Sequence, residues 1–486
     1  MKKKLLSLII MCIMAVSIFF TGCSCSKTGL TDNPPTDANT TSNGGMTVIK
    51  GDYLYYINGY LDETNKEELD KDGNKFGKIT RTGIYRTKLD NGKIQKDKDG
   101  FLTNSDLVVS KVVGFSNGGF YIIDDYIYYT TPYMNLSRDG KLQTSMVEFH
   151  RINIDGTDDK TIYTTPESQE NLEWSLYKID NTVYLTTYVA NKIVIVNTAS
   201  ASVVTEISDS TSHAMLNSTE YKTGMETTGE FENYIYYTRN IVASDNRDGN
   251  AKGNAVCRVN IATGAIDTLE VSDTYTYSIH SVSKNAINYF KTNSVYSGIK
   301  LLFTREITDK AWLSAVAYES QLSNADYSNY FVCNFGDNLV IADEKNGTYL
   351  LRNGYPTKIS SSQKTVLKMN GNIAYYINSN KLYSFDVING QIIDGEIEVK
   401  EITTSDKTHS ISNANDFDFD GQRVYMFANY TSANETVKIY LDYINNDGEE
   451  KFVGVFDKAD MPAKPTQDEN YGKEGYEDIK YIPWID

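Results

Sequence analysis

A serine between glycines is the first residue of this chain whose setting could support chemistry. Residues 114–118 read Gly-Phe-Ser-Asn-Gly, which is the spacing of a nucleophile elbow. That elbow requires a turn from a strand into a helix, with acid and histidine partners later in the chain. No helical pattern follows Ser116, and its Ser-Asn-Gly-Gly sequence also occurs at residues 42–45. We therefore interpret Ser116 as part of a structural turn.

Three acidic clusters offer the oxygen ligands that calcium prefers. Residues 416–421 read Asp-Phe-Asp-Phe-Asp-Gly, but Phe427 stands where a calcium loop needs a bidentate glutamate. Their alternating pattern predicts a strand instead. Residues 70–74 and 245–250 carry oxygen donors, with a glycine too early for an EF-hand. We expect no cofactor and no dedicated metal site, and weak calcium binding in the latter two clusters remains open.

Histidine and cysteine are too scattered to predict a catalytic or metal centre. The four histidines lack HxH, HxxxH and HExxH spacing, and Cys25, Cys257 and Cys333 form no CxxC pair. A glycoside hydrolase would need two convergent carboxylates, and among 64 acidic residues any chance pairing is uninformative. The sequence therefore singles out no catalytic group.

Cys23 is the one residue for which a covalent modification is predicted. Residues 1–22 have a basic start and an apolar stretch of signal-peptide length, and they end in Phe-Thr-Gly before Cys23. This junction resembles the bacterial lipobox, in which the cysteine thiol is diacylated. Two acyl chains suffice for stable anchoring without a membrane-spanning helix. An ordinary secretory signal and an uncleaved membrane helix are the alternatives.

The charge and composition of the remaining chain limit its partners and its surroundings. Residues 23–45 are rich in Ser, Thr, Asn, Pro and Gly, which predicts a disordered tether. The net charge of −17, without basic clusters beyond the N-terminus, disfavours nucleic acid and direct binding to anionic lipid. Abundant Lys, Asn, Ile and Tyr are typical of a Gram-positive bacterium, so we expect a lipid-anchored monomer on the outer face of the cytoplasmic membrane.

A recurring tyrosine-rich segment, which we call the tyrosine phrase, indicates the strands that position these residues. Residues 52–56, 125–129 and 233–237 read Asp/Asn-Tyr-Leu/Ile-Tyr-Tyr, a turn residue followed by the alternating pattern of a half-buried strand. Repetition at roughly 50 residues is typical of the four-stranded blades of a propeller. Weaker copies occur at residues 181–185, 285–289, 337–341, 371–376 and 421–425.

A second recurring strand follows the tyrosine phrase in several units. It alternates apolar and polar residues, often contains Tyr-Arg or His-Arg, and ends in a turn sequence such as Asn-Gly or Asp-Gly, a hairpin signal. In this alignment His150 and Cys257 take the position of Tyr85 and Tyr383, which predicts packing roles for both. The copies lie at residues 84–92, 149–156, 256–264 and 382–390.

Helical periodicity is nearly absent from the chain. Residues 312–322 are the one segment that we predict as a helical insertion. Residues 457–486 are acidic and contain proline, which predicts a mostly disordered tail. The aromatic end of the tail could dock on the domain or serve as a recognition peptide.

The order of these motifs resembles a bacterial domain family of unknown function that is related to the YWTD-type propeller of low-density-lipoprotein receptors. The shared features are the Ser-Asn-Gly-Gly turn, the tyrosine strand, the arginine strand and the closing turn, over residues 44 to 264. The resemblance implies an all-β propeller over residues 46–456, whose units run inner, tyrosine, arginine and outer strand. The parent propeller has six blades. Eight marker strands favour eight blades here, with seven or six as alternatives.

The same topology would gather the longest connections on one face of the disc. These are residues 58–82, 130–148 and 239–255, each following a tyrosine strand. Long loops on a rigid scaffold are frequent binding sites, although tolerated surface variation explains them equally well. The candidate binding residues of these loops are Tyr60, Asp70, Asp72, Tyr133, Arg138, Arg239, Asp245 and Asp248.

From these observations we predict a membrane-anchored extracellular propeller. It would bind or scaffold a protein or glycan of the cell envelope without catalysis. The alternative is a carbohydrate-active or other hydrolytic propeller that uses convergent carboxylates around its axis.

Overall fold

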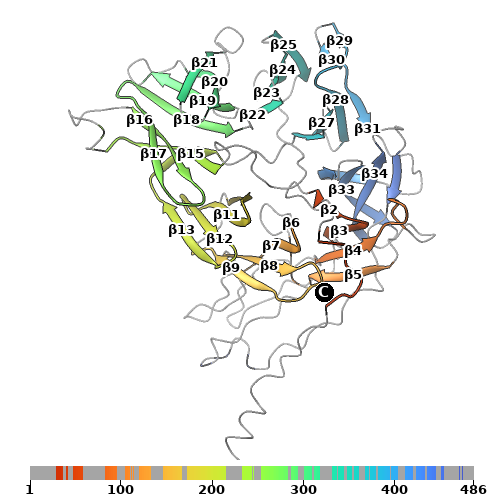
Figure 1. Ribbon diagram of the computed structural model, residues 1–486. Helices are drawn as coiled ribbons and strands as arrows, with labels where there is room; N and C mark the ends of the chain where they lie inside the picture. The colour runs from red at the N-terminus through yellow and green to blue at the C-terminus, as the bar shows by residue number, and fades with distance from the viewer. Residues whose placement is uncertain are drawn as a thin grey trace, which may run out of the picture.

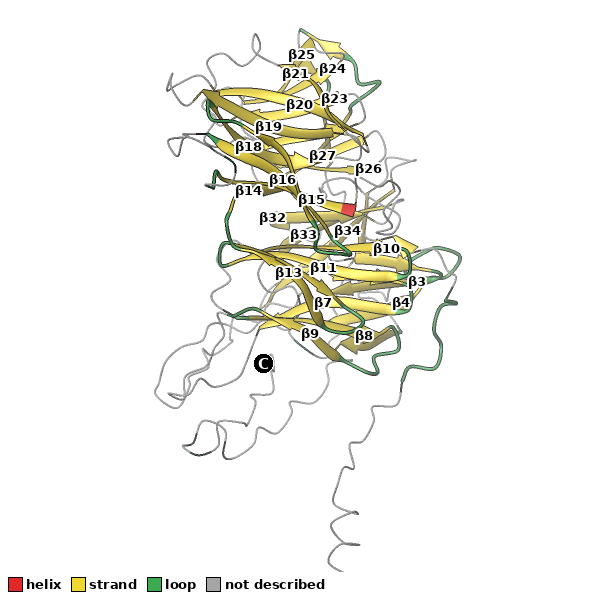
Figure 2. Ribbon diagram, turned by 60° about the vertical axis from the view of Figure 1, so that its left-hand side comes forward, coloured by secondary structure: helices red, strands yellow, loops and turns green. Residues whose placement is uncertain are grey.

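The structure is a computed structural model, and almost all of the residues that it describes lie in strands or turns (Figure 2). In the described part of the chain, no helix is long and apolar enough to cross a membrane. The described residues are 29–36, 40–41, 47–57, 83–95, 104–109, 111, 113, 120–132, 146–166, 172–214, 233–242, 245, 253–282, 286–293, 300–308, 311–317, 331–335, 338–343, 347–352, 355–360, 367–370, 373–378, 381–394, 396–402, 411–419, 423–432, 435–444, 450–453, 470, 473 and 475.

The described strands form eight sheets, and the first four follow one another in chain order. The first comprises β1 (Thr40–Thr41), β2 (Thr47–Lys50), β3 (Tyr53–Ile57), β4 (Ile84–Lys88) and β5 (Ser105–Val109). The second comprises β6 (Phe120–Ile123), β7 (Tyr126–Pro132), β8 (Val147–Asn153) and β9 (Lys160–Thr164). The third comprises β10 (Glu173–Ile179), β11 (Thr182–Val189), β12 (Lys192–Asn197) and β13 (Ser202–Ile207), and the fourth comprises β14 (Ser210–Ala214), β15 (Tyr234–Asn240), β16 (Asn254–Asn260) and β17 (Ile266–Val271).

The remaining four sheets also follow chain order, with one exception. The strands β29 (Ile392–Ile393) and β30 (Glu396–Ile397) come between two strands of the seventh sheet in sequence but belong to the sixth sheet. The fifth comprises β18 (Tyr275–Val282), β19 (Ala286–Asn293), β20 (Lys300–Thr308) and β21 (Ala311–Ala317). The sixth comprises β22 (Phe331–Phe335), β23 (Asn338–Asp343), β24 (Gly347–Arg352), β25 (Tyr355–Ser360), β30 and β29. The seventh comprises β26 (Leu367–Asn370), β27 (Ile373–Asn378), β28 (Lys381–Asp386) and β31 (Lys400–Ile402), and the eighth comprises β32 (Ile411–Phe419), β33 (Arg423–Ser432), β34 (Glu435–Ile444) and β35 (Glu450–Val453).

Leaving aside the short strand β1 at the edge of the first sheet, each of the eight tyrosine-phrase copies supplies the second strand of its own sheet. These strands are β3, β7, β11, β15, β19, β23, β27 and β33, and the arginine-type strands β4, β8, β16 and β28 are the third strands of theirs. The sheets follow one another around a ring (Figure 1), and first strands of successive sheets touch, as β2 touches β6 and β14 touches β18. The predicted all-β propeller and its strand order are therefore confirmed.

The ring closes where the last sheet meets the first. β32 contacts β2, and among the described strands neither sheet borrows a strand from the other end of the chain. The closure between the eighth and first sheets therefore rests on packing rather than on exchanged strands.

The core lies between successive sheets. One apolar cluster joins the first and second sheets through Val48, Tyr55 and Ile127. Similar clusters join the second to the third sheet, the third to the fourth, the fourth to the fifth and the sixth to the seventh. Because both faces of a sheet are covered, every residue of β3 is buried. The expected half-buried pattern was therefore wrong for β3.

The repeated arginines explain the first tyrosine of the phrase. Arg151 lies 4.5 Å from the ring centre of Tyr126, and Arg258 lies 4.1 Å from that of Tyr234. A guanidinium over an aromatic face is attracted by the ring quadrupole, by about 0.5–2 kcal/mol. The arginine of the third strand thus holds the start of the second strand in these sheets.

The turn before each second strand defines one face of the disc, which we call the turn face. Residues 124–125 and the turn after β8 lie on it together, because the Ile154 amide donates to the Asp125 carbonyl at 3.0 Å. The opposite face, the loop face, receives the connections that follow the second strands, since successive strands alternate in direction.

The predicted helix is wrong over the residues that the structure describes. Residues 312–317 belong to strand β21, in which Trp312 pairs with Ile307 and Ala317 with Phe303. The segment supplies the fourth strand of the fifth sheet, and this pairing overrides a weak local helical pattern. Residues 318–322 lie outside the described part.

Candidate functional site

Two of the eight predicted binding residues lie in the described part of the chain. Arg239 stands near the end of β15, at the loop face, and Asp245 lies in the connection that follows. Cys23 and the remaining predicted binding residues lie outside the described residues, namely Tyr60, Asp70, Asp72, Tyr133, Arg138 and Asp248.

Arg239 and Asp245 form a two-point ion pair. The arginine Nη1 and Nη2 donate to the aspartate Oδ2 and Oδ1 at 2.5 and 3.1 Å. Each side chain is only 12% exposed, so the pair is poorly screened by water. The hydrogen bond from Arg239 lowers the pKa of Asp245, and Asp245 in turn raises the pKa of Arg239.

The same pair shapes the beginning of the loop. Asp245 Oδ2 also accepts from the Val242 amide at 3.0 Å, and the Asp245 amide donates to the Val242 carbonyl at 2.9 Å. Arg239 Nη1 donates to the Asn240 carbonyl at 3.1 Å as well. The predicted binding residues Arg239 and Asp245 therefore fix the backbone of Asn240 and Val242 at the end of β15.

Cys257 lies behind this loop and is fully buried. Burial raises the pKa of its thiol, which favours the unreactive thiol form. Its Sγ lies 3.8 Å from the Thr268 hydroxyl, and it pairs with Tyr237 across β15 and β16. That register places it where Tyr85 faces Tyr56 in the first sheet, so the predicted alignment is confirmed.

His150 occupies the same position in the second sheet, opposite Tyr129. The two rings are stacked with centres 5.2 Å apart, as are Tyr376 and Tyr383 at 5.4 Å in the seventh sheet. His150 is 3% exposed. The register confirms the packing position predicted for this histidine.

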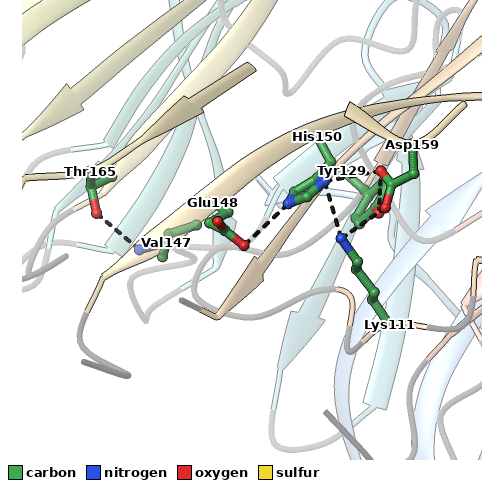
Figure 3. A network of polar contacts seen from close by, with 7 residues as sticks. All are labelled: Lys111, Tyr129, Val147, Glu148, His150, Asp159 and Thr165. Atoms are coloured by element: carbon green, nitrogen blue, oxygen red, sulfur yellow. Dashed lines mark hydrogen bonds and ion pairs between the residues drawn. The ribbon is translucent and has the colours of Figure 1, made fainter. Parts of the chain in front are cut away.

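His150 also stands at the centre of a polar network that the sequence did not predict (Figure 3). Its Nδ1 lies 2.9 Å from Asp159 Oδ1, and its Nε2 lies 3.4 Å from Glu148 Oε2. The Lys111 ammonium reaches Asp159 Oδ2 at 2.8 Å and His150 Nδ1 at 3.3 Å. Tyr129 donates its hydroxyl hydrogen to Asp159 Oδ1 at 2.9 Å.

Asp159 is the acid of this network, and its pKa is lowered. Burial alone would raise its pKa, but the hydrogen bond and charge of His150, together with Lys111, outweigh burial and hold the pKa at about 2. Burial first, and then the Asp159 charge, raise the pKa of Tyr129 well above its usual range.

The arrangement resembles an acid–base pair only in part. Nδ1 of His150 faces a carboxylate, as in a hydrolytic triad, but Nε2 faces Glu148 rather than a hydroxyl or thiol. Lys111 lies in the connection between the first and second sheets, so the network fastens that connection to the outer strands of the second sheet. Among the described residues, no three His, Cys, Asp or Glu side chains are grouped to hold a metal ion.

The chain is similar to several solved structures, but only at low identity. No family model matches the chain, and no curated protein matches it. Among solved structures, the chain is similar to dihydro-heme d1 dehydrogenase NirN in complex with DHE, with 10% identity over 89% of this chain and 76% of that one, at a TM-score of 0.41. The β-propeller domain of the Trilobed protease from Pyrococcus furiosus shows 12% identity over 88% and 99% of the two chains, at a TM-score of 0.33.

A third similar structure is a puromycin hydrolase. The identity is 9% and the TM-score is 0.40 over 69% of this chain, which spans about half (53%) of the length of that protein. The TM-scores of all three lie below 0.5, so the assignment of the propeller rests on the sheets of this chain itself.

Proposed function

We propose that this chain is a lipid-anchored propeller that binds or scaffolds a protein or glycan of the cell envelope without catalysis. The lipid would be carried by Cys23, on the outer face of the cytoplasmic membrane of a Gram-positive bacterium. The repeated tyrosine and arginine strands support placing the propeller with the YWTD type. Weak calcium binding in the loops over residues 70–74 and 245–250 stays part of the proposal.

One observation carries the proposal. The polar residues that the repeat brings into register are engaged in holding the scaffold, as Arg151 holds Tyr126 and Arg258 holds Tyr234. His150 and Cys257 likewise take packing positions. The units differ in the length of the connections that follow their second strands, and the ion pair of Arg239 and Asp245 holds the start of one of these connections. A rigid ring that presents variable loops favours recognition.

Recognition is tested with the chain from residue 24 onward, immobilised and exposed to fractionated cell wall and membrane. We expect it to retain a protein or glycan that rebinds after purification and competes in soluble form. A matched variant, Arg239→Ala with Asp245→Ala, should bind more weakly, whereas Asp158→Ala on the turn face should bind normally. Retention of nothing would overturn the binding role, and release of new reducing ends from wall glycan would favour the hydrolytic alternative.

Anchoring is tested separately with Cys23→Ala in the full chain. We expect the variant to leave the membrane fraction and to lose the mobility shift of the lipid-modified protein. Unchanged membrane retention would refute the lipobox assignment.

A further inference from the structure

A segment between the signal-like sequence and the first sheet lies against the turn face. We call residues 29–36 the strap. The Leu30 amide donates to the Asp155 carbonyl at 3.0 Å, and the Leu30 side chain packs on the core between the first and second sheets. Pro34 is buried. The strap thus holds the propeller with both backbone and apolar contacts.

Gly29 makes this approach possible. A Cβ at this position would lie 2.3 Å from Asp155 Oδ2 and 2.9 Å from its Cγ. Asp155 has little freedom to move aside, because its Oδ1 accepts from the Thr157 amide at 2.9 Å and from the Thr157 hydroxyl at 2.6 Å. The chain can pass the turn after β8 this closely only with a glycine.

Polar contacts from two consecutive residues fasten the strap to the first sheet. Asp32 Oδ2 lies 3.0 Å from the Lys88 ammonium, and a hydrogen bond with Tyr53 lowers the pKa of Asp32. The Arg86 guanidinium donates to the side-chain oxygen of Asn33. Arg86 is consequently 1% exposed, whereas Arg258, its counterpart in the fourth sheet, is 16% exposed.

The last residue of the strap and the strand β1 are both held near the inner edge of the ring. The Thr36 hydroxyl donates to Asp125 Oδ2 at 2.8 Å, and strand β1 then pairs with β2, so that Thr40 faces Lys50. Lys50 is fully buried and lies 3.8 Å from Asp125 Oδ1. The segment is therefore fixed at both ends, on the rim by Asp155 and at the inner edge by β2.

The docked strap shortens the free connection to Cys23. Residues 24–28 are the only ones between that cysteine and Gly29, and six extended steps span at most about 20 Å. A tether that stayed free to residue 46 could extend to about 75 Å. Since the strap leaves the disc at the turn face, this face of the first two sheets must stay close to whatever surface holds Cys23.

From this geometry we infer that the propeller is held with the turn face of its first two sheets toward the lipid bilayer. The loop face, with Arg239 and Asp245, then points away from the membrane. The inference rests on the proposed lipid anchor at Cys23. It adds an orientation that a free tether would not impose, and it assigns the partner to the side away from the membrane.

The orientation is measured on the lipid-modified full chain in vesicles that carry a fluorescent acceptor on their headgroups. Donor dyes are placed on Ser200→Cys and, separately, on Ser208→Cys, with Cys25 and Cys333 replaced by serine. Both serines are exposed and flank the same strand, β13, with Ser200 at the turn face and Ser208 at the loop face. The two sites are separated by roughly 25 Å.

We expect about twofold more energy transfer from residue 200 than from residue 208. Equal transfer, or more transfer from residue 208, would overturn the inference. The variant Gly29→Leu with Asp32→Ala and Asn33→Ala blocks the close approach to Asp155 and removes both polar contacts, so it releases the strap and should bring the two efficiencies together while the protein stays on the vesicles. An unchanged difference in that variant would also overturn the inference.

Failure of the anchor itself has a distinct signature. If Cys23 is not lipidated, neither donor transfers energy, and the protein floats apart from the vesicles. In that case the proposed function fails as well. If the protein co-floats with the vesicles and the two donors transfer equally, only the orientation is wrong.

Discussion

Asp159 and His150 show how a packing position can acquire an electrostatic role. The His150 imidazole occupies a position at which other units have a phenol ring. Asp159 forms an ion pair with His150 and another with Lys111. The position of His150 was predictable from the alignment of third strands. Its partners were not, because Lys111 lies in a connection and Asp159 in a turn, where no periodic pattern fixes the side chains.

The low pKa of Asp159 makes a pH-dependent contribution to stability. Its folded pKa of about 2 lies below the usual value of 3.8, so the contribution is complete above pH 4 and is lost as the pH falls toward 2. We expect Asp159→Asn to lower the free energy of unfolding by about 2 kcal/mol at pH 7, and hardly at pH 2. Urea unfolding at several pH values measures the difference.

The neighbouring Asp158 supplies the control for this experiment. It pairs with Lys160 at 2.6 Å, but its side chain is 51% exposed. Because exposed ion pairs contribute little, Asp158→Asn should change the stability only slightly at any pH. A pH-independent loss in Asp159→Asn would show that the loss comes from packing rather than from charge.

Loss of the ion pair of Arg239 and Asp245 should loosen the start of the loop that follows β15 without lowering the stability of the whole protein. In Asp245→Asn the Val242 amide loses a charged acceptor and Arg239 loses its counter-ion. A hydrogen bond to a charged group contributes about 1.5–3 kcal/mol, so the Val242 amide should exchange its hydrogen at least about tenfold faster. Asp267→Asn, which removes the exposed partner of Arg258, should leave Val242 unchanged. Equal exchange rates in both variants would contradict this assignment.

Among the elements, the second and third strands were the easiest to predict from sequence. All eight marker strands were located, because turn residues followed by alternating aromatic and β-branched residues are a strong signal. The segment around Trp312 was wrong, since small and apolar residues fit either period and only the pairing with β20 decides. The strap was missed because its partners, Asp125 and Asp155, lie far away in the sequence and its composition is typical of a tether.

The hairpin of β29 and β30 connects the sixth and seventh sheets, and we predict that it stabilises the contact between them. It leaves the seventh sheet after β28 and adds to the edge of the sixth, where Lys358 pairs with Glu396 in parallel. Ile397 anchors it, because it is 3% exposed in the core with Leu350. Ile397→Ala should lower the free energy of unfolding by about 2 kcal/mol or more.

Ile393 on the same hairpin is the matched control. It is 55% exposed, so Ile393→Ala should leave the midpoint of thermal unfolding nearly unchanged. If both alanine variants behave alike, the hairpin does not join the two sheets in solution.

At the scale of the whole molecule, the ring is closed by the contact between β32 and β2. Leu54 and Tyr56 of β3 are 2% and 1% exposed, and they alternate with Tyr55, which packs toward the second sheet. They therefore point to the opposite side, toward the eighth sheet. Removing that sheet would uncover them.

A chain that ends at residue 402 lacks the eighth sheet and tests whether closure stabilises the propeller. Since burial of a large apolar side chain contributes about 1.5–3 kcal/mol, exposing Leu54 and Tyr56 should cost several kcal/mol. We expect a clearly lower midpoint of thermal unfolding and new binding of a hydrophobic dye. A chain that ends at residue 456 keeps every described strand and should unfold like the full chain. If the two truncated chains unfold alike, the first sheet does not depend on the eighth, and the propeller is stable as an open ring.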